Sequence, residues 1–282
     1  MAPQPPLGII AGGGVLPGRV AAAAQAAGRQ VFLVGLEGYA DPAVLAPFPH
    51  GFARLGAVGS IRALLRNQGC TELVLIGAVR RPSLTDLRPD AEGVRLLARI
   101  GRAAFAGDDG LLAAIVRILR EDGFAVRGAQ EILHAALAPA GLLSRAAPDA
   151  QAMADISRGL AVLGLLGAAD IGQACVVQQG IVLAVEAAEG TDAMIARAGT
   201  LARPGARPVL VKRAKPGQDR RVDLPTIGPA TIAAAAAAGL AGLACEAGST
   251  LIADRAGLLA RADETGLFVL GLDPQSLTGE PE

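Results

Sequence analysis

Aromatic side chains are almost missing from the sequence. Its 282 residues include no Trp and one Tyr, and aromatic residues make up 2% of the total. Proteins that bind single-stranded nucleic acid stack bases on such rings, so a stacking platform of that kind is not expected. A positive excess is missing too, because 26 Lys and Arg balance 26 Asp and Glu. A general nucleic-acid binder normally carries a basic surface, and we therefore expect no nucleic-acid partner.

Cysteine and histidine are scarce as well. Cys70, Cys175 and Cys245 stand far apart in the sequence, and none belongs to a Cys-x-x-Cys pair. This pattern indicates neither a zinc site nor a disulfide framework. With only 2 His in the chain, a histidine-rich metal centre is not expected either.

The sequence shows no segment typical of export or of membrane insertion. Residues 1–6, with the sequence MAPQPP, lack the basic start and the apolar core of a signal peptide. The most apolar long stretch, residues 231–244, contains two glycines and is shorter than the roughly 18–20 residues that a membrane helix needs. We expect a soluble protein in the reducing cytoplasm.

Hydrophobic residues are plentiful, at 52%, and supply ample core for one large domain or two modest ones. In the first half, short apolar runs alternate with helical stretches that end at glycines, which is typical of a parallel sheet with helical crossovers. We expect a Rossmann-like domain over residues 1–132, with Ser60 and Asp108 as helix N-caps. The expected elements are strands at 7–11, 31–34, 73–76 and 124–126 and helices at 19–27, 60–68 and 111–121.

A looser segment predicts a linker over residues 133–148, and the pattern changes beyond it. We expect a C-terminal α/β catalytic domain over residues 149–282, with a frayed tail after Asp273. The fold class is therefore α/β, with a Rossmann-like N-terminal parallel-sheet domain plus a distinct mixed α/β C-terminal domain. Its expected elements are a helix at 149–166, a hairpin of strands 175–178 and 181–184, a strand at 208–211 and a second hairpin of strands 243–245 and 250–253.

Gly12, Gly13 and Gly14 stand between the first expected strand and its helix. Such a turn lets backbone N–H groups approach a phosphate, and the helix N-terminus adds a favourable dipole. Pro17 occupies the position of the third glycine of the dinucleotide fingerprint, which weakens the case for NAD. The alternative is a tight strand-to-helix turn without a ligand. Arg80 follows the strand at 73–76 and can reach a phosphate at the same edge of the sheet.

Residues 212–223 contain five Lys and Arg and two Asp. The turn at Pro216-Gly217 lets cations on its two sides converge on a diphosphate, whose oxygens arginine can bind in pairs. A solvated, charged loop is the alternative. Asp223 ends this run just before the rigid Pro225 and Pro229. A carboxylate fixed beside cations suits a divalent metal or a general base.

An acidic cluster, Glu186, Glu189 and Asp192, follows the strand at 181–184 and surrounds Thr191. These side chains offer oxygen ligands for Mg²⁺ or contacts to a sugar. The alternative is that they are merely favourable charges near a helix N-terminus. The Asp pair at 108–109 is interpreted as a helix cap rather than a ligand.

Taken together, these segments resemble the LpxI-type family of bacterial UDP-2,3-diacylglucosamine pyrophosphatases. The matching stretches keep their order over nearly the whole chain. They are GIIAGGGVLP at 8–17, GDD at 107–109, EGTD at 189–192 and the run 212–231, in which KPGQD and DLPTIG are the most specific.

The resemblance implies that the substrate lies between a Rossmann-like domain and a C-terminal α/β domain. It implies Mg²⁺-dependent hydrolysis of the diphosphate, with Mn²⁺ as the alternative ion, to UMP and 2,3-diacylglucosamine 1-phosphate (lipid X) for lipid A synthesis. In this family, water is directed to the sugar-side phosphorus. The family's catalytic aspartate falls on Asp223.

On these grounds we expect Asp223 to be catalytic and to bind the metal together with Asp192. The expected partner is a lipid-linked sugar nucleotide. Peripheral contact with the cytoplasmic face of the inner membrane and a homodimer are further expectations. The expected substrate- and phosphate-binding residues are Gly12, Gly13, Gly14, Arg80, Lys212, Lys215, Gln218, Arg220, Arg221, Thr226, Glu189 and Thr191.

Two other functions stay open at this point. An NAD(P)-dependent oxidoreductase rests on the glycine turn, with Glu37 as the acid for the ribose. A non-enzymatic module that binds a sugar nucleotide or a lipid needs the cationic run but no metal-dependent rate.

Overall fold

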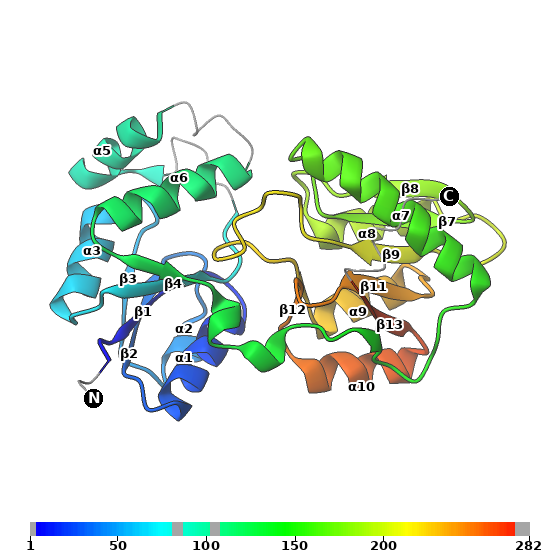
Figure 1. The fold of residues 1–282 in the computed structure, drawn as a ribbon, viewed down its shortest axis with the longest axis horizontal. Helices are drawn as coiled ribbons and strands as arrows, with labels where there is room; N and C mark the ends of the chain where they lie inside the picture. Colours follow the sequence, from blue (N-terminus) through cyan, green and yellow to red (C-terminus); the bar gives the residue numbers. More distant parts are fainter. Residues whose placement is uncertain (1–3, 81–86, 102–107, 274–282) are drawn as a thin grey trace. The chain divides into compact units, whose positions relative to one another are not determined.

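The computed structural model describes residues 4–80, 87–101 and 108–273, except for the side chains of residues 108 and 109. The chain forms two compact units, which are identified by colour along the sequence in Figure 1. Unit 1 consists of Met1–His134 and Asp219–Asp223, and unit 2 consists of Ala135–Gln218 and Leu224–Glu282. The short segment Asp219–Asp223 therefore packs with unit 1 although its sequence neighbours on both sides belong to unit 2.

Within the described residues, unit 1 is built on one parallel sheet of five strands in the order β3-β2-β1-β4-β5 (Figure 1). The chain moves outward from β1 to β3 and then returns to β4 on the other side of β1. The carboxyl ends of β1 and β4 thus flank the point where the strand order reverses, which is where open parallel sheets bind ligands. The strands are β1 Leu7–Ala11, β2 Val31–Leu36, β3 His50–Ala53, β4 Glu72–Ile76 and β5 Ala125–Arg127.

The helices of unit 1 confirm most of the expected elements and correct one cap. Helix α1 has Pro17 in its first turn. The N–H groups of the first turn have no carbonyl partner within the helix, so the missing N–H of proline costs no hydrogen bond. The N-cap expected at Ser60 is wrong, because α3 already begins at Val58 and follows Ala57. Asp108 is the first residue of α6, and its expected capping side chain lies outside the described residues. The helices are α1 Leu16–Ala26, α2 Pro42–Leu45, α3 Val58–Asn67, α5 Ala91–Ile100 and α6 Asp108–Glu121, with short 3-10 turns at Ala129–Glu131 and His134–Ala136.

Unit 2 contains a mixed sheet with the order β6-β13-β11-β9-β7-β8. Strands β9, β11 and β13 run parallel to one another, while β7, β8 and β6 each pair antiparallel with a neighbour. A separate pair, β10 and β12, is parallel. The strands are β6 Gly141–Leu142, β7 Ala174–Gln178, β8 Ile181–Val185, β9 Val209–Lys212, β10 Thr226–Ile227, β11 Gly242–Glu246, β12 Leu251–Ile252 and β13 Phe268–Leu272.

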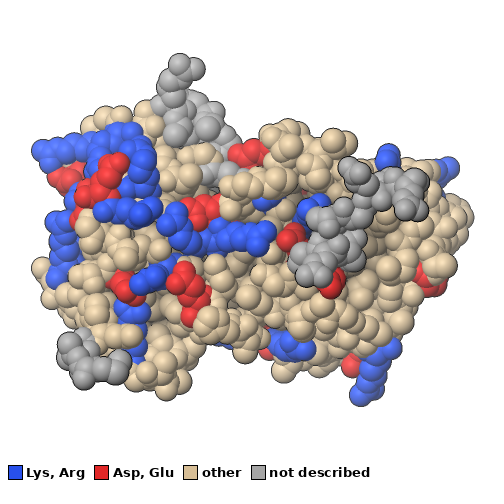
Figure 2. Space-filling view, viewed as in Figure 1, with Lys and Arg blue, Asp and Glu red and all other residues tan. Residues whose placement is uncertain are grey.

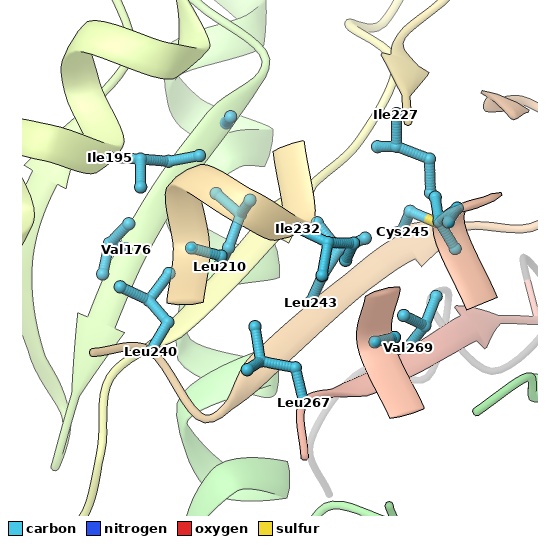
Figure 3. Close-up of a cluster of buried hydrophobic side chains, with 14 of the residues drawn as sticks. Val176, Ile195, Leu210, Ile227, Ile232, Leu240, Leu243, Cys245, Leu267 and Val269 are labelled. Carbon is cyan, nitrogen blue, oxygen red and sulfur yellow. The ribbon is translucent and has the colours of Figure 1, made fainter. Parts of the chain in front are cut away.

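Both faces of this mixed sheet are covered by helices, and the side chains of its inner strands alternate between two cores. In β7, for example, Val176 belongs to the core beside α8, α9 and α10, whereas Cys175 and Val177 belong to the core beside α7. Because successive strand residues point to opposite faces, a strand buried on both sides is apolar throughout. Figure 3 shows one core, with Val176, Leu210, Leu243 and Val269 of four neighbouring strands near Ile195 and Ile232. The helices are α7 Ala150–Ala168, α8 Thr191–Thr200, α9 Pro229–Ala237 and α10 Arg255–Thr265.

The first expected hairpin is confirmed, and a buried carboxylate holds its turn. Strands β7 and β8 pair antiparallel around Gln179 and Gly180, both of which have positive φ angles, 49° and 76°. Asp155 on α7 is fully buried and accepts hydrogen bonds from the backbone N–H of Gln179 at 2.9 Å and of Gly180 at 2.7 Å. The contact ties the turn to the helix and compensates the strained φ of a residue other than glycine.

The second expected hairpin is wrong. Strand β11 pairs parallel with β9 and β13, while β12 pairs parallel with β10, so the two strands are not partners. The turn between them bonds elsewhere, since the N–H of Gly248 donates to the carbonyl of Ala138. All five residues of β11 are buried, as in a central parallel strand.

The expected fold class is confirmed, because a parallel-sheet unit precedes a distinct mixed α/β unit. Among the described residues, none of the helices combines the length and apolar character that crossing a membrane requires.

Asp155 provides a test of how the hairpin is stabilised. Asp155→Ala removes the acceptor of two backbone N–H groups, and leaving such a group unpaired costs about 1–3 kcal/mol. We expect the free energy of unfolding of unit 2 to fall by about 1–3 kcal/mol, measured by chemical denaturation. The amide protons of Gln179 and Gly180 should exchange with solvent faster than in the parent protein.

The matched control is Glu264→Ala, which removes a carboxylate whose side chain is 69% exposed. Surface changes of this kind usually stay within about 0.5 kcal/mol. Equal stabilities of the two variants, with unchanged exchange at the turn, would contradict the role assigned to Asp155.

Candidate functional site

The glycine turn lies at the carboxyl ends of β1 and β4, and it brings two backbones into close contact. The N–H of Gly12 donates to the carbonyl of Ile76, and Gly13 exchanges two backbone hydrogen bonds with Ala78. A Cβ on Gly12 would lie 2.6 Å from the carbonyl oxygen of Gly77, so only glycine fits there. The N–H groups of Gly12 and Gly13 are therefore engaged inside unit 1, and the turn has a packing role.

Arg80 lies close to this edge of the sheet. Its side chain is exposed, and its backbone carbonyl accepts a hydrogen bond from the hydroxyl of Tyr39 at 3.0 Å. The residue expected to reach a phosphate thus stands beyond the end of β4, at the point where the strand order reverses.

The turn at Pro216-Gly217 is present and is braced by Gln218. Gly217 has a φ of 79°, and the N–H of Lys215 donates to the side-chain oxygen of Gln218 at 2.9 Å. Gln218 is buried, and its side chain shapes this turn. Its expected contact with substrate stays a prediction. Beyond Gln218 the chain passes into unit 1, and it returns to unit 2 at Leu224.

The cations of residues 212–223 therefore divide between the two units. Lys212 and Lys215 belong to unit 2, and Arg220 and Arg221 belong to unit 1 together with Asp223. Several of these charges have partners within their own unit. Lys215 forms an ion pair with Asp170, which lies after the end of α7.

Asp219 organises the backbone that carries Asp223. The carbonyl of Asp219 accepts hydrogen bonds from the N–H groups of Val222 and Asp223, each at 3.1 Å. Its carboxylate accepts from the N–H of Arg221 at 3.1 Å and from two nitrogens of the Arg221 guanidinium at 2.8 and 2.6 Å. Those side-chain hydrogen bonds lower the pKa of Asp219. The segment is thus a compact turn held by a bidentate acid–arginine pair.

Within unit 1, this turn and α6 line a cavity of about 460 Å³. Three arginines and two acids contribute to its wall, so its charge favours an anion, and a volume of this size suits a small ligand. The helix residues recur at the spacing of one helical face. The lining residues are Ala113, Val116, Arg117, Arg120 and Glu121 of α6 with Asp219 and Arg221.

Sequence analysis did not identify the contribution of α6. The spacing of Arg117 and Arg120 does place both on that helical face, as its third and fourth residues. In the sequence, however, these arginines look like ordinary surface charges. Figure 2 shows Lys and Arg interleaved with Asp and Glu over the α5–α6 side of unit 1. Several pairs there are structural, including Arg99 with Glu121 at 2.7 Å and Arg117 with Glu121 at 2.8 Å.

In unit 2, three polar side chains form a chain of hydrogen bonds at the carboxyl ends of β8 and β9. The ammonium of Lys212 donates to the hydroxyl of Thr191 at 2.6 Å. That hydroxyl donates to a carboxylate oxygen of Glu186, also at 2.6 Å. Lys212 and Glu186 are 3% and 8% exposed. Two expected binding residues, Lys212 and Thr191, are therefore in contact, and Glu186 joins them.

The other members of the acidic cluster do not enter this chain of hydrogen bonds. Glu189 forms an ion pair with Arg197 and accepts from the N–H of Ala187 at 3.2 Å. The hydrogen bond from Arg197 lowers the pKa of Glu189. Asp192 is exposed in the first turn of α8. Its position there suits the positive end of the helix dipole.

Thr226 begins β10, and its hydroxyl donates to the carbonyl of Leu224 at 3.2 Å. It thus lies where the chain re-enters unit 2. Pro229 opens α9 behind Gly228, as expected from the rigid turn.

A grouping of metal ligands does not appear in the described part of the chain, where no three His, Cys, Asp or Glu side chains lie together in a way that could hold an ion. The two carboxylates expected to bind metal, Asp223 and Asp192, belong to unit 1 and unit 2 respectively.

Comparison with known proteins bears directly on the resemblance noted in the sequence. Residues 6–136 match the model of the LpxI N-terminal domain, and residues 139–270 match that of the LpxI C-terminal domain. A protein of Caulobacter vibrioides, named UDP-2,3-diacylglucosamine pyrophosphatase LpxI, is 46% identical over 275 residues, which cover 95% of this chain and 98% of that relative. The two matched regions lie in order and span nearly the full length, and the chain belongs to the LpxI family.

Proposed function

We propose that this protein hydrolyses the diphosphate of UDP-2,3-diacylglucosamine and releases UMP and 2,3-diacylglucosamine 1-phosphate for lipid A synthesis. The observation that carries the proposal is the 46% identity to a protein named for this pyrophosphatase activity over 95% of the chain.

The polar residues of both units supply what the reaction needs. Diphosphate hydrolysis depends mainly on neutralising negative charge and on positioning a water molecule. In unit 1, Asp223 orients the water or the metal, and the arginine-lined cavity, with Arg120 and Arg221, attracts the anionic substrate. In unit 2, the ammonium of Lys212 binds a phosphate oxygen.

A single carboxylate such as Asp223 suits Mg²⁺ only when the ion binds together with the substrate. Mg²⁺ is commonly held by one or two carboxylates, with substrate phosphates and waters completing its coordination. We infer that Asp223 holds it. When bound, the ion withdraws charge from the phosphoryl oxygens. Mn²⁺ prefers the same oxygen ligands and would serve in its place.

The location of the reaction follows from its substrate. Because that substrate is a lipid, we infer peripheral contact of the protein with the cytoplasmic face of the inner membrane. The strand order of unit 1 supports a Rossmann-like classification of its sheet, with the expected phosphate-binding edge at the ends of β1 and β4.

The two competing functions have less support. A dinucleotide site would use free N–H groups of the glycine turn, whereas those of Gly12 and Gly13 bond to backbone carbonyls. A binding module without activity would share the cavity and the lysines, so only a measured rate separates it from a hydrolase.

The first test is hydrolysis of UDP-2,3-diacylglucosamine in ¹⁸O-labelled water, with the products analysed by mass spectrometry. We expect UMP and 2,3-diacylglucosamine 1-phosphate to appear with Mg²⁺ present, and to stop appearing when EDTA removes it. The label should enter the lipid product, because water attacks the sugar-side phosphorus. Label in UMP would refute that direction of attack, and EDTA-resistant turnover would refute the metal requirement.

The second test concerns Asp223. Asp223→Asn keeps the size of the side chain but removes its charge, and loss of a positioned acid–base or metal-binding group typically lowers turnover by about 10²-fold or more. We expect kcat to fall by at least that factor at saturating Mg²⁺, measured by UMP release. Glu37→Gln is the control, since Glu37 is exposed and has a role only under the oxidoreductase alternative. Full turnover of Asp223→Asn would contradict the proposed catalytic role of Asp223.

The third test concerns the turn that carries Asp223. Asp219→Ala removes the acceptor of three hydrogen bonds, so the backbone at Asp223 should shift, and displacement by about 1 Å can cost on the order of 10² in rate. We expect kcat to fall between that of the parent and that of Asp223→Asn. Asp219→Asn, which keeps one carbonyl oxygen for Arg221, should lose less. Parent-like kcat in Asp219→Ala would show that Asp219 does not position Asp223.

A further inference from the structure

Glu186 is a buried carboxylate with only one of its two oxygens bonded. The residue is 8% exposed, and one oxygen, Oε1, accepts the hydroxyl proton of Thr191 at 2.6 Å. The other oxygen, Oε2, is buried and has no hydrogen-bond partner among the described residues. Burying a polar atom without a partner lowers stability, so such a residue calls for a role other than stabilising the fold.

Thr191 connects Glu186 to Lys212 in a defined direction. A hydroxyl has one proton, and that of Thr191 is donated to Glu186. The oxygen of Thr191 therefore presents a lone pair to the ammonium of Lys212, which donates to it at 2.6 Å. The direction of the Thr191 hydroxyl, and with it the position of the ammonium, thus depends on Glu186.

Glu186 and Glu189 have different partners around the loop that precedes α8. Glu186 directly follows β8, and Thr191 is the first residue of α8. In the loop between them, Glu189 pairs with Arg197, whose guanidinium also donates to the carbonyl of Val185 at 3.0 Å. The loop is thus held by Glu189 and Arg197.

We propose that Glu186 is a positioning residue, which acts through the hydroxyl of Thr191 to hold the ammonium of Lys212 where it binds the substrate diphosphate. The inference rests on the proposed function, because Lys212 acts on a diphosphate only if that is the substrate. The Lys side chain has four rotatable bonds, so an unrestrained ammonium would lose conformational freedom when it binds the diphosphate. Two hydrogen bonds in series remove that freedom beforehand.

The test is a double-mutant cycle on Glu186 and Thr191, with kcat and KM measured for UDP-2,3-diacylglucosamine. The variants are Glu186→Gln, Thr191→Val and the double variant, with Thr191→Ser as the conservative replacement that keeps the hydroxyl. We expect each single change to lower kcat/KM by about 10-fold or more, mostly through KM, because Lys212 contacts the diphosphate before reaction. The double variant should be no worse than Thr191→Val, because the connection is already broken.

Two comparisons separate positioning from a purely structural role. Thr191→Ser should recover kcat/KM to within about 3-fold of the parent, since its hydroxyl makes the same two hydrogen bonds. Glu264→Gln, a change at an exposed side chain of α10 in unit 2, should leave kcat/KM near the parent value. Urea unfolding should give equal midpoints for the parent and Glu186→Gln. Should Glu186→Gln fail to fold, the Val and Ser replacements of Thr191 still decide the question.

Three results would overturn the proposal: effects of Glu186→Gln and Thr191→Val that multiply in the double variant, no recovery with Ser, or equal losses in Glu186→Gln and Glu264→Gln. Lys212→Met separates this failure from failure of the proposed function. A large loss in Lys212→Met with a multiplicative cycle would reject Glu186 alone. Parent-like activity in Lys212→Met would reject both the contact of Lys212 with the diphosphate and the positioning of Lys212 by Glu186. A parent protein that releases no UMP would reject the proposed function itself.

Discussion

The bidentate contact between Asp219 and Arg221 holds the turn that carries Asp223. The chain leaves unit 2 after Gln218 and returns at Leu224, and only five residues are available to form a turn that packs on unit 1. Asp219 makes this possible because its carbonyl and its carboxylate together accept hydrogen bonds from Arg221, Val222 and Asp223. A short segment held internally in this way can present Asp223 with little loss of entropy when substrate binds.

Much of the fold could be predicted from the sequence because it depends on local patterns. Apolar runs indicated β1, β2, β4 and β5 of one sheet and β7, β8, β9 and β11 of the other, whereas β6 and β13 were not predicted. Gln179-Gly180 marked a real hairpin. Patterns do not identify partners, however. Instead of forming one hairpin, the apolar runs on either side of Gly248 pair parallel with other strands, β11 with β9 and β13 and β12 with β10. Strand β3 was missed because Ala53 is its one buried residue, so it shows no apolar run.

The candidate site was predictable to a smaller extent, for a physical reason. Residue type and spacing indicated Lys212, Thr191 and Asp223, since each carries chemistry that a phosphate needs. The residues that hold them, Glu186 and Asp219, act through other side chains and look like ordinary loop acids in a sequence. Glu186 and Glu189 stand three residues apart with the same chemistry, yet one is buried on Thr191 and the other pairs with Arg197 at the surface. Only tertiary structure separates them.

The lysines and arginines of residues 212–223 also differ in their surroundings in the two units. Lys212 is almost fully buried in unit 2, where its ammonium donates to the hydroxyl of Thr191. The arginines of the cavity in unit 1 stand closer to solvent, where ion pairs contribute little to stability and exchange partners readily. Lys212 is thus held in place by its surroundings, whereas the side chains of the surface arginines can change partners.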